Sequence, residues 1–120
     1  MIRDTLTAYF DTLNTHSPEN AIEFFTDKVE ITVNYGKDYS YQGPKEGIIS
    51  YLEMAFDLAP DSKISEVTIS KIKINQNKAT VQISYMISSE SLNFSMPAKE
   101  YLDLIKQNNK WRIRRTNIEY

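Results

Sequence analysis

One carboxylate interrupts an otherwise apolar alternation in residues 92–106. The even positions of this segment carry Leu92, Phe94, Met96, Ala98, Glu100, Leu102 and Leu104, whereas most of its odd positions are polar. Because side chains alternate between the two faces of a strand, Glu100 is expected to point inward with its apolar neighbours. A carboxyl group in apolar surroundings has either a raised pKa or a compensating cation. Glu100 is therefore the first candidate for acid or base chemistry.

The turn after this segment predicts which residues face Glu100. Asn108 and Asn109 suit a two-residue hairpin turn, because asparagine tolerates positive φ. The expected cross-strand pairs are Leu104 with Ile113, Leu102 with Arg115, Glu100 with Asn117 and, on the outer face, Asp103 with Arg114. In this register Trp111, Arg115 and Asn117 share the inner face, and Arg115 is the diagonal cation for Glu100.

Three tyrosines could add hydrogen-bond donors to the same interior. Tyr9 lies on the apolar face of the first helical segment, whereas Tyr51 and Tyr85 are expected on the inner sides of a later helix and a central strand. Such hydroxyls can donate to a ligand carbonyl or oxyanion. The structural alternative is a set of core aromatics with satisfied hydroxyls, and for Glu100 it is a buried ion pair or a place at the solvated end of the fold.

Three amphipathic stretches are expected to form the helices that close over these residues. Apolar residues recur every three or four positions in each, and the predicted spans are 2–13, 18–25 and 48–59. Ser17 followed by Pro18 is typical of an N-cap and first helical position. The third helix must end before Pro60.

Alternating segments are expected to form the sheet. The predicted strands are 29–35, a partner around Tyr39 and Tyr41 after a turn at 36–38, 67–74 with a bulge between Ser70 and Lys71, 79–87, 92–106 and 110–118. Helices first and a meander of strands after them is an α+β order. We therefore expect one domain over residues 1–120, with three N-terminal helices packed on a curved, mainly antiparallel sheet.

Composition narrows the classes of function. The 120 residues are 41% hydrophobic and 25% charged, as in one ordinary globular domain. A formal charge of −2 disfavours nucleic acid and anionic membrane as partners. No cysteine and one histidine leave no thiolate or multi-histidine metal site, so we expect no metal and no other cofactor. Without an apolar span or a signal pattern a cytoplasmic location is expected, although a secreted protein trimmed of its signal peptide would look the same.

Several segments carry a family resemblance. They are residues 9–14 at the end of the first helix, 24–29 leading into the first strand, 41–44 with Ile48 and Ile49 opening the third helix, and 110–113 in the last strand. Together they resemble the nuclear transport factor 2-like superfamily, which includes the ketosteroid isomerases and SnoaL-like polyketide cyclases. The resemblance implies a cystatin-like cone with a pocket for apolar small molecules, and a homodimer formed through the outer sheet face.

The resemblance also implies roles for individual residues. Tyr9 is similar to the tyrosine that donates to the oxyanion in ketosteroid isomerases, and Glu100 or Tyr101 falls near their protonated carboxylic acid. The aspartate base of those enzymes falls at Val33 or Asn34, and neither side chain can abstract a proton. Val33 is therefore expected to line the pocket.

Two functions follow from these observations. The first is a domain that binds a small apolar molecule, with proton-transfer, isomerase or hydration and dehydration activity as the enzymatic form. Its predicted site has Glu100 and Tyr9 as catalytic residues and Tyr51, Tyr85, Arg115, Asn117, Val33 and Trp111 as ligand-binding residues. The second is a non-catalytic homodimeric interaction module with a filled pocket, in which Tyr101, Ile105 and Met86 act on the outer sheet face.

Overall fold

The computed structural model describes residues 1–35 and 37–120 as helices, strands and short connections. The elements are α1 (Ile2–Asn14), α2 (Pro18–Ala21), the 3-10 helix η1 (Ile22–Phe24), β1 (Phe25–Tyr35), β2 (Lys37–Pro44), α3 (Gly47–Leu58), β3 (Lys63–Asn75), β4 (Lys78–Ser89), β5 (Phe94–Gln107) and β6 (Lys110–Glu119). Among these residues no helix is long and apolar enough to cross a membrane.

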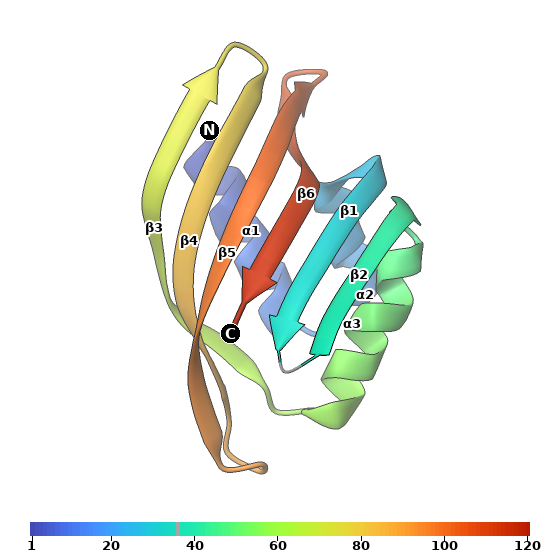
Figure 1. Ribbon diagram of the computed structural model, residues 1–120, viewed down its shortest axis with the longest axis vertical. Helices are drawn as coiled ribbons and strands as arrows, with labels where there is room; N and C mark the ends of the chain where they lie inside the picture. The colour runs from blue at the N-terminus through green and yellow to red at the C-terminus, as the bar shows by residue number, and fades with distance from the viewer. Residues whose placement is uncertain (36) are drawn as a thin grey trace.

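The strands form one six-stranded sheet in the order β2-β1-β6-β5-β4-β3. Every neighbouring pair is antiparallel except β1 and β6, which run parallel. The sheet curves around α1, which lies behind its central strands, while α3 flanks the β1–β2 end (Figure 1). The predicted α+β architecture, with α-helices packed on a curved and mainly antiparallel sheet, is confirmed.

The helices arise where the sequence predicts them, with one exception. All five apolar residues of the α1 stripe, namely Ile2, Leu6, Tyr9, Phe10 and Leu13, are buried. The predicted second helix is too long, because α2 ends at Ala21 and β1 already begins at Phe25. Phe25 pairs with Ile113 of β6 and is 1% exposed, so sheet pairing and burial outweigh the local helical pattern.

Two register shifts between β3 and β4 contribute to the curvature of the sheet. The predicted bulge is confirmed by a register shift between Ile69 and Lys71, and a second shift between Ser65 and Thr68 was not predicted. Such bulges bend a strand and increase its twist. Of the predicted turn at 36–38, Gly36 lies outside the described residues.

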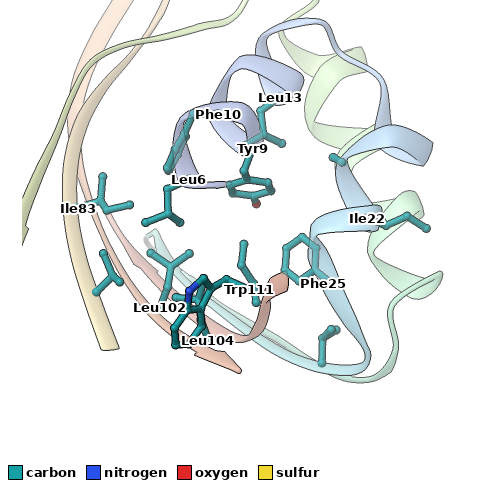
Figure 2. Packing of buried hydrophobic residues seen from close by; sticks show 14 of the residues in the cluster. Leu6, Tyr9, Phe10, Leu13, Ile22, Phe25, Ile83, Leu102, Leu104 and Trp111 are labelled. Atoms are coloured by element: carbon teal, nitrogen blue, oxygen red, sulfur yellow. The ribbon is translucent and has the colours of Figure 1, made fainter. Parts of the chain in front are cut away.

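The core lies between α1 and the concave face of the sheet. Figure 2 shows Leu6 and Phe10 of α1 facing Ile83 and Leu102 across this space, with Trp111 and Leu104 at one end. These side chains belong to one cluster of buried residues. The same face of the sheet continues beyond this cluster, and that continuation forms the candidate site.

Candidate functional site

Glu100 lies at the centre of the concave face and is 1% exposed, which confirms its predicted inward orientation. Tyr85 of β4 donates a hydrogen bond to Glu100 Oε1 at 2.9 Å, and Thr116 of β6 donates to Oε2 at 2.5 Å. These donors sit diagonally on the two strands that flank β5. Burial raises the pKa of Glu100 and outweighs the two hydrogen bonds, which act in the opposite direction.

A cavity of about 550 Å³ opens next to Glu100, between the sheet, α1 and α3. Most of its wall is aliphatic or aromatic, for example Leu13, Phe25, Ile31, Ile48, Leu52 and Ile118. The basic side chains in the described lining are His16 and Lys63. None of the ion pairs within residues 1–35 and 37–120 includes Glu100. The carboxyl group is therefore buried beside an apolar space without a paired cation.

Tyrosine side chains supply the other polar groups of the wall. Tyr9, Tyr51, Tyr85 and Tyr120 all line the cavity. Burial, and after it the charge of Glu100, raises the pKa of Tyr9 and Tyr85 well above the ordinary value and that of Tyr51 to about 12. These hydroxyls therefore keep their protons at neutral pH and can act as hydrogen-bond donors.

The predicted register between β5 and β6 is correct only next to the turn. Asn108 and Asn109 have φ values of 52° and 63°, and Leu104 pairs with Ile113 as predicted. Beyond that pair the register shifts by one residue, so that Asp103 lies opposite Arg115 and Leu102 opposite Thr116. The pairs Leu102 with Arg115, Glu100 with Asn117 and Asp103 with Arg114 are wrong. An extra residue in β6 reverses the facing of every later side chain.

This shift removes two predicted residues from the cavity wall. Arg115 is on the outer face, where its guanidinium contacts Glu30 at 2.8 Å and Asp103 at 3.5 Å. Asn117 is also on the outer face, in register with Tyr101. Thr116 and Ile118 take the inner positions instead and are buried. The prediction of Arg115 as a diagonal cation for Glu100 is therefore wrong. The hydroxyl groups of Tyr85 and Thr116 lie at the diagonal positions instead.

The remaining predicted residues divide between the two ends of the interior. Val33 is 6% exposed and lines the cavity together with Tyr9, Tyr51 and Tyr85. Trp111 does not line it. Its ring packs in the core near Leu104 (Figure 2) and borders a separate surface hollow beside Phe24.

Thr116 and Tyr120 were missed by the sequence prediction. A signal for Thr116 exists, because Ile113 and Ile118 are five residues apart and cannot share one face of a regular strand. Both are buried, so the strand between them has to contain a bulge. No comparable pattern marks Tyr120.

The cavity opens at an apolar rim. Met54 and Leu58 of α3 and Leu92 of the β4–β5 turn line it and are 53%, 69% and 53% exposed. The His16 ring, also in the wall, stacks on Phe56 with centroids 4.3 Å apart. A ligand that enters from this side therefore meets mainly apolar and aromatic side chains before it reaches Glu100.

The fold and this cavity define the class of protein as nuclear transport factor 2-like, with the cystatin-like cone expected from the sequence. The chain belongs to the family described as putative lumazine-binding, which matches residues 1–115. No functionally curated protein matches the chain.

Solved structures of three bacterial proteins illustrate the shared fold. An NTF-2 like protein of unknown function from Shewanella oneidensis is 14% identical, with a TM-score of 0.79 over 99% of this chain and 96% of that one. A ketosteroid isomerase-like protein from Erwinia carotovora atroseptica is 16% identical, with a TM-score of 0.77 over 98% and 92%. A putative scytalone dehydratase from Novosphingobium aromaticivorans is 15% identical, with a TM-score of 0.75 over 98% and 79%.

Proposed function

We propose that the cavity binds a small, mainly apolar molecule that carries a carbonyl group, and that Glu100 exchanges a proton with it. The observation that carries this proposal is a fully buried carboxyl group, without a paired cation, in the wall of a largely apolar cavity of about 550 Å³. Cavities of this size are typical of small-molecule sites. A buried acid with a raised pKa is better suited than an ordinary carboxyl group to giving a proton as well as taking one.

The hydrogen bonds of Glu100 support this role. In its ionised form the carboxylate accepts from Tyr85 and Thr116, and in its neutral form one oxygen can donate. Tyr9 and Tyr51 line the same cavity and keep their protons. A ligand carbonyl could therefore accept a hydrogen bond from a tyrosine while Glu100 takes a proton from the adjacent carbon.

Val33, at a position that corresponds to the aspartate base of ketosteroid isomerases, limits the reactions that we propose. Val33 lines the cavity and has no ionisable group, so we assign both removal and return of the proton to Glu100. Proton exchange, isomerisation and hydration or dehydration beside a carbonyl all need only one such group. Two of the similar structures, described as ketosteroid isomerase-like and as a putative scytalone dehydratase, have names that refer to an isomerisation and a dehydration.

The family description raises lumazine as another ligand. Lumazine presents several hydrogen-bonding groups around a polar bicyclic ring, and each needs a partner once it is buried. The polar groups in the wall are mainly Glu100 and tyrosine hydroxyls. A ligand with one polar end and an apolar body therefore matches the wall better, and lumazine serves as the comparison compound.

A matched pair of ligands tests the binding. We expect 2-acetylnaphthalene to bind about tenfold more tightly than 2-ethylnaphthalene, since the carbonyl adds one hydrogen bond in a dry site. Isothermal titration measures both. The double variant Tyr9→Phe and Tyr51→Phe should remove the preference for the ketone, because it deletes the proposed donors to the carbonyl, whereas Tyr101→Phe on the outer sheet face should keep it. Equal affinity of the wild-type protein for the two compounds, or tighter binding of lumazine than of both, contradicts the proposal.

Proton transfer is tested on the same ketone. The wild-type protein should accelerate exchange of the methyl protons of 2-acetylnaphthalene for deuterium in D2O, followed by proton NMR. Glu100→Gln should abolish the acceleration because the amide cannot take up a proton. If Glu100→Gln exchanges at the wild-type rate while binding persists, the cavity binds ligands but Glu100 is not the base.

A second candidate function is a homodimer formed through the outer sheet face. Tyr101 lies on this face and is 37% exposed. A second copy could cover its ring. Sedimentation velocity at micromolar concentration should report a dimer that Tyr101→Glu dissociates and Ser50→Glu on α3 does not. A wild-type monomer would exclude this candidate.

A further inference from the structure

We infer that Asp61 is a positioning residue that holds the β4–β5 turn against the connection from α3 to β3, and thereby sets the width of the cavity mouth. This inference rests on the proposed function only in taking the mouth as the route of the ligand. The turn, residues 90–93, and the connection, residues 59–62, extend side by side at the mouth from the last β3–β4 pair, Lys63 with Ser88. Both ends of this contact carry residues that line the cavity, Leu92 on the turn and Ser62 on the connection.

Asp61 makes a fork of hydrogen bonds to the turn. Its Oδ1 accepts from Ser89 Oγ at 2.5 Å and from Ser91 Oγ at 2.8 Å, and its Oδ2 accepts from the Ser91 backbone N–H at 2.8 Å. The Ser89 hydroxyl in turn accepts from the backbone N–H of Leu92 at 3.3 Å. One carboxylate therefore determines where the backbone that carries Leu92 lies.

The connection and the start of β3 are hydrogen-bonded to the end of α1 and the residues after it, so the turn is held against a fixed part of the protein. Asn14 at the end of α1 donates to the Ile64 carbonyl at 2.9 Å and accepts from the Ile64 backbone N–H at 2.8 Å. Nε2 of His16 lies 2.9 Å from the carbonyl oxygen of Ser62. Asp61 stands between these anchors and the turn.

The turn has few other supports. It closes a hairpin that projects past the other strands of the sheet at the lower end of the view (Figure 1). Within the turn, the backbone N–H of Asn93 donates to the Glu90 carbonyl, a bond that does not link the turn to the body of the protein. Leu92 is 53% exposed, so packing adds little to hold it. Beyond the last pairs of the two backbone ladders, Lys63 with Ser88 and Ser89 with Phe94, the Asp61 fork is the polar link between the turn and the connection in the described part of the chain.

An ionised acid at position 61 can accept every hydrogen bond that the turn offers. All three protein donors point at acceptor oxygens, which a carboxylate supplies in full and an amide only in part. The hydrogen bonds from Ser89 and then from Ser91 lower the pKa of Asp61 to about 2, so the fork persists throughout the neutral range. Asp61→Ala removes all three acceptor contacts. Asparagine would not, because its amide can turn so that the oxygen accepts from the Ser91 N–H while the NH2 group donates to the serine hydroxyls.

The experiment measures opening of the mouth without any ligand. The chain has no cysteine, so a single thiol can be introduced and its reaction with a neutral maleimide followed by mass spectrometry. Val33→Cys places the thiol in the cavity wall, and Val81→Cys places it in the sealed core of the same sheet. Adding Asp61→Ala should speed labelling at position 33 by about tenfold and leave position 81 unchanged, because local opening exposes only the cavity.

Each other outcome overturns the inference. Equal acceleration at both positions means that Asp61→Ala loosens the whole fold, and no acceleration at either means that the fork does not control the mouth. Asp57→Ala removes an exposed acid at the end of α3, and as the matched control it should change neither rate. The labelling result does not depend on ligand binding, so failure of the proposed function in the naphthalene experiments is distinguishable from failure of this inference.

Discussion

The space between the helices and the sheet has a filled end and an open end. At the filled end Leu104 and Trp111 pack beneath α1 (Figure 2), Ile113 belongs to the same buried cluster, and none of the three borders the cavity. At the open end the same two strands carry Glu100 and Thr116. One sheet thus supplies a close-packed core and, a few residues further along, a cavity with a buried acid.

The two ends differ in how their side chains are satisfied. Apolar side chains at the filled end gain stability by burial and by contact with their neighbours. Glu100 gains nothing from burial and is held by two hydroxyl groups of flanking strands. A group that costs stability is kept in structures chiefly where it has a function, which is why the open end is the candidate site.

The largest difference should appear when one leucine at each end is shortened. Leu104→Ala leaves a new void in a packed core and should lower the free energy of unfolding by about 3 to 5 kcal/mol. Leu52→Ala, at the cavity wall, should cost at least about 1 kcal/mol less, because one side of Leu52 already lacks packing partners. Urea unfolding followed by circular dichroism measures both. Equal losses would mean that the cavity wall is as tightly packed as the core.

The pH dependence of stability should isolate the buried acid. The pKa of Glu100 is raised in the folded protein, so its contribution is fully present below the unfolded pKa and is lost as the pH rises through the folded pKa. Relative to Glu100→Gln, the wild-type protein should lose about 1.4 kcal/mol for every pH unit that separates the two pKa values. Urea unfolding of both proteins between pH 4 and about 8 tests this across the range in which a raised carboxyl titrates. A constant difference would indicate that the carboxyl is satisfied as an ordinary ion.

A smaller effect should follow from removing one hydroxyl beside Glu100. Thr116→Val keeps the shape of the side chain and deletes the hydrogen bond to Oε2, at an expected cost of about 1 to 2 kcal/mol at neutral pH. The loss should shrink at acid pH, where Glu100 is neutral, because a hydrogen bond that lowers the pKa favours the charged form. A loss that is independent of pH would assign Thr116 a packing role only.

The smallest effect should come from the adjacent outer face. Arg115→Met breaks contacts with Glu30 and Asp103, but the guanidinium side chain is half exposed, so the loss should stay below about 1 kcal/mol and shrink in high salt. Thermal unfolding at two salt concentrations is sufficient. A loss larger than that of Thr116→Val would show that the outer face, not the cavity, contains the important polar network.

Local patterns predicted the parts of this protein that depend on a few consecutive residues. The α1 stripe, the inward Glu100 and the turn at Asn108 and Asn109 follow from helical period, strand alternation and tolerance of positive φ. Each of these rules operates within one element. They were therefore available before any contact between elements was known.

Contacts between elements distant in sequence could not be predicted from such local patterns. The extra residue near Arg114 in β6 is absorbed by pairing with β5, and it placed Thr116 beside Glu100 and moved Arg115 and Asn117 outward. The fork of Asp61 joins residues about thirty positions apart along the chain. A cone-like α+β fold with one inward carboxylate was predictable from the sequence. The register and the closing contacts, which depend on the balance of many cross-strand energies, decided what surrounds that carboxylate and how its cavity opens.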